Sequence, residues 1–128
     1  MQPPSILIVD DEPYIRTLLE QTLEDLEGAA MIYTAVDGRD GLQQARVLKP
    51  RVMFLDIMMP HLDGFEVCRL LREDPALNET VVVLLTARGQ EVDRQKGLEV
   101  GANLYITKPF DPDAVLSLAR QVLEEGIA

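Results

Sequence analysis

Five side chains of the sequence could together bind a divalent cation and react with a phosphoryl group: Asp10, Asp11, Asp56, Thr86 and Lys108. Carboxylate oxygens are preferred by hard cations, and a site with few carboxylates and several waters suits Mg²⁺. Close carboxylates oppose one another's ionisation unless a cation neutralises them. With an added ammonium and hydroxyl, such a cluster could transfer a phosphoryl group, with one carboxylate as the nucleophile.

The elements that must position these side chains begin with five short apolar runs. Each run is continuous rather than alternating, which is typical of strands covered on both faces in a parallel sheet. The predicted strands are residues 6–9, 31–36, 52–55, 81–85 and 104–106.

Segments with helical spacing separate the predicted strands. The first carries an apolar stripe from Ile15 to Leu26, which Gly28 would end, and the others cover residues 39–49, 64–73, 89–100 and 112–125. Asp111 is a candidate N-cap of the last helix, with Pro112 at its first position. Because strand and helix alternate five times, the sequence predicts a single α/β domain with a parallel, doubly covered sheet.

In such a sheet, ligands bind beyond the carboxyl ends of the strands, which is where all five polar side chains would gather. Taken singly, each has a structural explanation. Aspartates after strands often cap the next helix, a threonine can simply end a strand, and Thr107-Lys108-Pro109 could be a turn. Four strand ends carrying such residues in one sheet favour a functional site instead.

Composition limits the classes of function. The chain has 128 residues, 47% of them hydrophobic and 27% charged, with a formal net charge of −10. These values are typical of one globular domain. The negative charge opposes direct binding to nucleic acid, whereas cations and basic partner surfaces fit it; solubility alone explains most of these carboxylates.

Cysteine use and hydropathy indicate a reducing, aqueous compartment. Cys68 is the only cysteine, so no internal disulfide can form, and its position on a predicted helix favours a small core residue. No apolar run approaches the length of a membrane span, and the first residues lack the features of a secretory signal. We therefore expect a cytoplasmic protein without a membrane partner.

The motifs together resemble the receiver domain of two-component response regulators, over essentially the whole chain. They read ILIVDDEPYIR (6–16), VMFLDIMMPHLDGFEVCRLLR (52–72), VVVLLTARGQ (81–90) and GANLYITKPF (101–110), and their wording is closest to the winged-helix transcription-factor branch. The resemblance implies a (βα)5 flavodoxin-like fold with a five-stranded parallel sheet in the order 2-1-3-4-5. It also implies that residues 1–128 are a receiver domain, either alone or as the N-terminal part of a longer regulator.

The resemblance further implies a role for each site residue. Asp56 would be the phosphoacceptor, receiving the phosphoryl group from a histidine kinase or a histidine phosphotransfer protein. Mg²⁺ would be held by the carboxylates of Asp10, Asp11 and Asp56 and by the backbone carbonyl of Met58. Lys108 would contact the phosphoryl group, and its bond to Pro109 would be cis.

A switch is implied as well. The hydroxyl of Thr86 and the backbone amide of Ala87 would bond the phosphoryl group. Tyr105 would then turn inward behind Thr86, although an amphipathic surface aromatic without a switching role also fits this position. The surface of the fourth helix, fifth strand and fifth helix would change, and a downstream output domain or partner protein would read it.

Some positions depart from the family pattern. Asn103 and Leu104 stand where the family often has two acidic residues, and the last helix lacks a lysine that is common in the transcription-factor branch. A symmetric dimer through those charges is therefore in doubt, so that both a monomer and a phosphorylation-dependent homodimer stay open. Leu104 could mark a more apolar contact. Met58 and Arg88 would tune the lifetime of the phosphoryl group, and His61 is expected in a loop without a chemical role.

Two other interpretations compete. A haloacid-dehalogenase-like phosphatase also uses an aspartyl nucleophile, but it needs a second aspartate two residues later, where this chain has Met58. A degenerate receiver that only binds partners would not need the complete set of acidic, hydroxyl and ammonium side chains. We expect a signalling domain that catalyses only its own phosphorylation and dephosphorylation.

Overall fold

The five predicted strands form one parallel sheet in a computed structural model, which describes residues 3–26, 29–87 and 91–125. The order is β2-β1-β3-β4-β5, so the predicted α/β class, flavodoxin-like topology and strand order are confirmed. The bounds are β1 Ser5–Val9, β2 Met31–Ala35, β3 Val52–Asp56, β4 Val81–Ala87 and β5 Leu104–Lys108.

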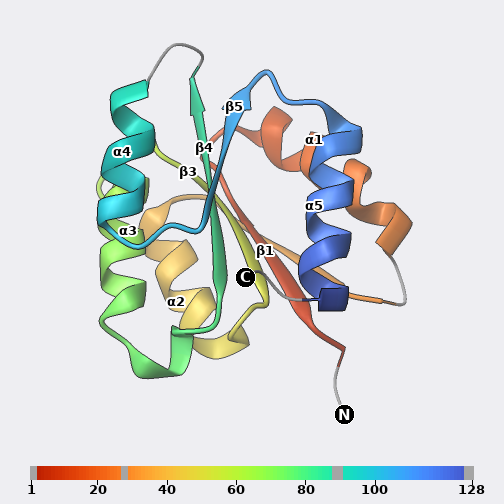
Figure 1. Ribbon diagram of the computed structural model, residues 1–128, viewed down its shortest axis with the longest axis horizontal. Helices are drawn as coiled ribbons and strands as arrows, with labels where there is room; N and C mark the ends of the chain where they lie inside the picture. Colours follow the sequence, from red (N-terminus) through yellow and green to blue (C-terminus); the bar gives the residue numbers. More distant parts are fainter. Residues whose placement is uncertain (1–2, 27–28, 88–90, 126–128) are drawn as a thin grey trace.

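Helices cover both faces of the sheet, with α1 and α5 on one side and α2, α3 and α4 on the other (Figure 1). Within the described residues no helix is both long and apolar enough to cross a membrane. The bounds are α1 Pro13–Leu23, α2 Gly38–Leu48, α3 Gly64–Arg72, α4 Glu91–Glu99 and α5 Pro112–Glu125, with 3₁₀ turns at Glu24–Leu26 and Pro75–Leu77.

Helix boundaries follow local side-chain chemistry. Asp111 accepts a hydrogen bond from the backbone N–H of Asp113 at 3.0 Å, which confirms its predicted place ahead of α5. Asp63 and Glu66 form a reciprocal capping box at the start of α3, which fixes where this helix leaves the loop after β3. The first helix is shorter than predicted, because its last turn tightens into a 3₁₀ turn; Gly28 lies outside the described residues.

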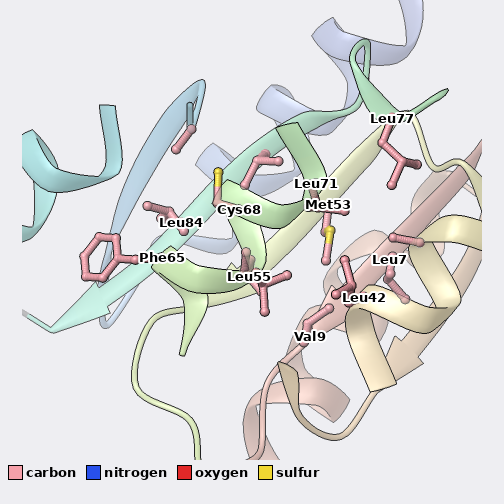
Figure 2. Packing of buried hydrophobic residues seen from close by; sticks show 14 of the residues in the cluster. Leu7, Val9, Leu42, Met53, Leu55, Phe65, Cys68, Leu71, Leu77 and Leu84 are labelled. Carbon is pink, nitrogen blue, oxygen red and sulfur yellow. The ribbon is translucent and has the colours of Figure 1, made fainter. Parts of the chain in front are cut away.

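Alternate residues of the buried strands supply two apolar clusters, one on each face of the sheet. In β3, Val52 and Phe54 face α1 and α5, whereas Met53 and Leu55 face α2 and α3. Figure 2 shows the second cluster, in which Cys68 packs among leucines. Cys68 is fully buried, which confirms its predicted core role, and this burial raises the pKa of its thiol to about 11.

Arg72 of α3 fastens the connection between α4 and β5. Its guanidinium donates to the carbonyls of Gly101 at 2.8 Å and Leu77 at 3.2 Å, and to the side-chain oxygen of Asn103 at 2.7 Å. The same oxygen of Asn103 accepts the N–H of Val82 at 2.8 Å. Asn103, one of the departures from the family pattern, therefore holds the start of β5 against β4 and α3.

We expect Arg72→Ala to lower the free energy of unfolding by about 2–3 kcal/mol, since it leaves several acceptors without their donor. The matched control is Arg69→Ala on the same helix, which removes only an exposed pair with Glu73 at 3.0 Å. That change should cost about 0–0.5 kcal/mol. Urea unfolding of both variants measures these changes. Equal losses of unfolding free energy would show that the Arg72 hydrogen bonds do not stabilise the fold more than the exposed pair of Arg69 does.

Candidate functional site

Three of the predicted site side chains meet at the carboxyl edge of the sheet. The Nζ atom of Lys108 lies 3.0 Å from an oxygen of Asp10 and 3.1 Å from an oxygen of Asp56, and so bridges the two carboxylates. Three of the predicted strands were too short at their carboxyl ends: Asp56 and Lys108 are the last residues of β3 and β5, and Thr86 lies within β4. Backbone pairing therefore fixes these residues directly.

The register of the sheet accounts for this convergence. Asp56 pairs with Leu85, Thr86 with Thr107, and Ala87 with Lys108, so neighbouring strands end at the same level. Among the described residues the buried polar side chains are those of Asp10, Asp56, Thr80 and Thr86, and all except Thr80 belong to this edge. Because burying polar groups costs free energy, their concentration here indicates a functional site.

Asp10 is the most completely enclosed member of the cluster. One carboxylate oxygen accepts from the N–H of Glu12 at 2.9 Å and the other from Lys108. The carbonyl of Asp10 accepts from the guanidinium of Arg16 at 2.8 Å. Arg16 was missed from the sequence, although a basic residue one helical turn after Glu12 could have suggested it. Both the main chain and the side chain of Asp10 are thus held in place.

Three carboxylate oxygens at this edge lie close enough together to hold a metal ion. One oxygen from each of Asp10, Asp11 and Asp56 lies within 4.8 Å of the other two, and Asp11 is exposed whereas its two neighbours are buried. Few carboxylates with an opening to water fit a Mg²⁺ ion that keeps several water ligands. The donor set therefore fits the predicted cation.

The remaining predicted residues surround the cluster at different depths. Met58 follows β3 in the loop, with its side chain 76% exposed, and the Ala87 backbone ends β4. Half-buried Tyr105 stands three residues before Lys108 and lines a cavity of about 240 Å³ between α4 and β5. Arg88 lies outside the described residues. The predicted cis bond between Lys108 and Pro109 is present.

Gly64 closes the loop that follows Asp56. A Cβ atom on Gly64 would stand 2.9 Å from the Cα atom of Ile57 and against the carbonyl of Asp56. The N–H of Gly64 donates to the carbonyl of Ile57 at 2.9 Å. Gly64 thus shapes this loop, and His61 is an exposed loop residue with a left-handed backbone.

Burial changes the ionisation of the central carboxylate. It raises the pKa of Asp56 from 3.8 to about 6, with a further increase from Asp10 and a smaller one from Asp11, while Lys108 acts in the opposite direction. For Lys108, burial disfavours the ammonium, but the hydrogen bonds and charges of Asp10 and Asp56 outweigh it and leave the pKa raised. At neutral pH the cluster therefore holds mostly ionised Asp56 beside a positive lysine.

In metal-free protein we expect the Asp56 carboxyl carbon to titrate by NMR with a midpoint of about 6. Between about pH 4 and 6 the folded state holds the proton more strongly than the unfolded state, so this group lowers stability as pH rises through that window. Lys108→Ala should raise the midpoint, whereas Lys49→Ala, at an exposed position, should leave it unchanged. A midpoint near 4 would contradict the burial of the Asp56 carboxyl group beside Asp10.

Comparison with known proteins finds a family model and relatives that match most of the chain. The sequence model of the response regulator receiver domain matches residues 6–120. The alkaline phosphatase synthesis transcriptional regulatory protein PhoP of Bacillus subtilis is 42% identical over 121 residues, covering 94% of this chain and 49% of that protein. The chain thus spans about half the length of this curated relative.

Solved receiver structures have the same architecture. Chemotaxis protein CheY4 of Vibrio cholerae superposes with a TM-score of 0.84 at 31% identity, covering 94% of this chain and 99% of that one. The receiver domain of sensor histidine kinase PA1611 from Pseudomonas aeruginosa, described with a magnesium ion in its active site cleft, gives 0.84 at 25% identity, covering 95% and 98%. With the sheet order, the family match and the PhoP relative in agreement, the chain belongs to the response regulator receiver domain family of two-component signal transduction.

Proposed function

We propose that the chain is a phosphorylation-dependent signalling switch whose phosphoacceptor is Asp56. The observation that carries this proposal is the bridge from Lys108 to both Asp10 and Asp56, beside three carboxylate oxygens suited to a cation. An ion pair alone would need no exposed third carboxylate, and a metal site alone would need no ammonium group bridging two of its carboxylates. An ammonium group and a cation site together can neutralise the negative charge of a transferring phosphoryl group.

Asp56 acts as the nucleophile. One of its carboxylate oxygens forms a bond to phosphorus while the bond from phosphorus to the donor breaks, and the donor leaves with the electron pair. In a histidine kinase or phosphotransfer protein the leaving atom is an imidazole nitrogen. In the metal-free protein a pKa of about 6 leaves Asp56 mostly ionised at neutral pH, which is the form that a nucleophile requires.

Charge neutralisation comes from two sides. Asp10, Asp11, Asp56 and the Met58 carbonyl would hold Mg²⁺, which neutralises charge on the transferring group. Lys108 already lies 3.1 Å from Asp56, so its ammonium can move onto a phosphoryl oxygen while keeping Asp10 as its partner. The chain thereby serves as catalyst for its own phosphorylation and dephosphorylation, and for no separate substrate.

The switch follows from the added charge. An acyl phosphate brings roughly −2 of charge to the edge where Thr86 is buried and the Ala87 amide ends β4. Thr86 and the amide bond the phosphoryl oxygens, and Tyr105 turns toward the space behind Thr86. The surface of α4, β5 and α5 changes, which alters contact with an output domain or a second copy of the chain.

The partners follow from the same assignment. A histidine kinase or histidine phosphotransfer protein supplies the phosphoryl group to this domain in the cytoplasm, and the output is transcriptional regulation, as named for PhoP. Nucleic acid would be bound outside this domain, since its charge of −10 opposes phosphate backbones. The domain is either a separate protein or the N-terminal part of a longer regulator.

We expect acetyl phosphate with Mg²⁺ to add the mass of one phosphoryl group, as seen by intact mass spectrometry. Asp56→Asn and removal of Mg²⁺ by EDTA should each abolish the adduct. Asp113→Asn, which changes an exposed acid in the first turn of α5, serves as the control and should retain the adduct. An unmodified wild-type chain would favour a binding module, and rapid turnover of a phosphomonoester would favour a phosphatase.

Acceptance and switching should separate in two further variants. Lys108→Ala should slow phosphorylation by about 10²-fold, because it removes a charged donor from the transition state. Thr86→Ala should still accept the phosphoryl group, but the amide NMR shifts of β5 on phosphorylation should be largely lost. Stopped-flow kinetics and NMR spectra of both variants test this. Full β5 shifts in Thr86→Ala would remove Thr86 from the switch.

A further inference from the structure

A second surface lies at the end of the sheet opposite Asp56. A groove of about 750 Å³ is formed by the first residues of β1 and β2, the end of α2 and the approach to β3. Its lining includes Pro4, Met31, Tyr33, Val47, Lys49 and Arg51. The proposed phosphorylation mechanism uses none of these residues, so the groove needs a separate explanation.

The groove exposes apolar side chains. Val47 is 78% exposed and Met31 is 48% exposed, and they are two of the six large hydrophobic side chains that stand exposed among the described residues. Half-buried Tyr33 lies with them along the same groove. Apolar side chains gathered around a concave surface are typical of a contact site rather than of scattered surface residues.

The charge of this region is opposite to that of the chain as a whole. The chain has 22 acidic residues, yet segments 3–9, 29–36 and 41–55 contain none of them. The basic residues in these segments are Arg46, Lys49 and Arg51, and the last two line the groove. A partner with negative charge is therefore complementary to this corner of an acidic molecule.

The backbone of Lys49 and the side chain of Arg51 each have a distinctive conformation or contact. Lys49 ends α2 in the left-handed conformation, with φ 48° and ψ 61°, where glycine or asparagine is ordinarily favoured. A lysine in this conformation costs free energy, and such residues often belong to binding sites. The guanidinium of Arg51 donates to the carbonyl of Val122 at 3.1 Å, which limits its movement.

We propose that this groove binds an extended acidic segment of a partner protein that carries one large apolar side chain. Acidic side chains of the segment pair with Lys49 and Arg51, and the apolar side chain covers Met31, Tyr33 and Val47. β2 is an edge strand of the sheet, so it can lie alongside an extended chain. Three basic residues on a chain of net charge −10 are too few to hold a nucleic acid backbone.

The test uses the unphosphorylated 128-residue chain and a synthetic peptide, acetyl-Asp-Glu-Phe-Glu-Asp-amide, followed by amide NMR shifts and fluorescence polarisation. We expect saturable binding with the largest shifts at residues 31–33 and 47–51. Replacing the phenylalanine of the peptide by glycine, or its acids by lysines, should weaken binding. Phosphorylation is not needed for these measurements, so they are independent of the proposed function.

Lys49→Gly separates binding from folding. Glycine accepts the left-handed backbone, so the melting temperature should stay equal or rise, while affinity for the peptide falls by about fivefold through loss of one exposed ion pair. The control, Arg120→Glu, changes an exposed charge on α5 outside the groove lining and should bind as wild type does. Equal binding of the lysine peptide, unchanged affinity in Lys49→Gly, or binding only to vesicles of anionic phospholipid would overturn the proposal.

Discussion

The structure depends on keeping two buried carboxylates side by side. Asp10 and Asp56 repel each other, and in the described structure Lys108 lies within 3.1 Å of both. This arrangement is tolerable only if the three groups cannot drift apart, because an unpaired buried charge is costly. Parallel strands meet the requirement, since each group stands at or just after the end of a different strand whose position is set by main-chain hydrogen bonds to its neighbours.

Much of the fold and of the arrangement of these three groups could be predicted from the sequence. Continuous apolar runs indicated buried parallel strands, and the polar residues after them indicated a shared edge, because parallel strands all end on the same side. The sheet order and the meeting of Asp10, Asp56 and Lys108 agree with that reasoning. The exact ends of the strands were not predictable, because Asp56, Thr86 and Lys108 are polar, and apolar runs cannot reveal that the ladder continues through them.

Contacts between segments that are far apart in the chain could not be predicted from the sequence. The residues around Arg72 in the sequence do not indicate that its guanidinium donates a hydrogen bond to Asn103, 31 residues further along the chain. The left-handed backbone of Lys49 was equally hidden, because the residue type argues against it. Such features depend on the three-dimensional path of the loops that connect helices and strands. Sequence patterns report local periodicity and turn preferences, and they carry little information on the path of these loops.

The loop between Asp56 and α3 is anchored at both ends. Gly64 packs against the carbonyl of Asp56 and bonds to Ile57, and the capping box of Asp63 fixes the start of α3. Between these anchors the side chain of Met58 points largely into water. Side chains in this short arc can therefore diverge during evolution without moving the Asp56 carboxylate. A lineage of such proteins can acquire new partner preferences here while the Asp56 carboxylate keeps its place.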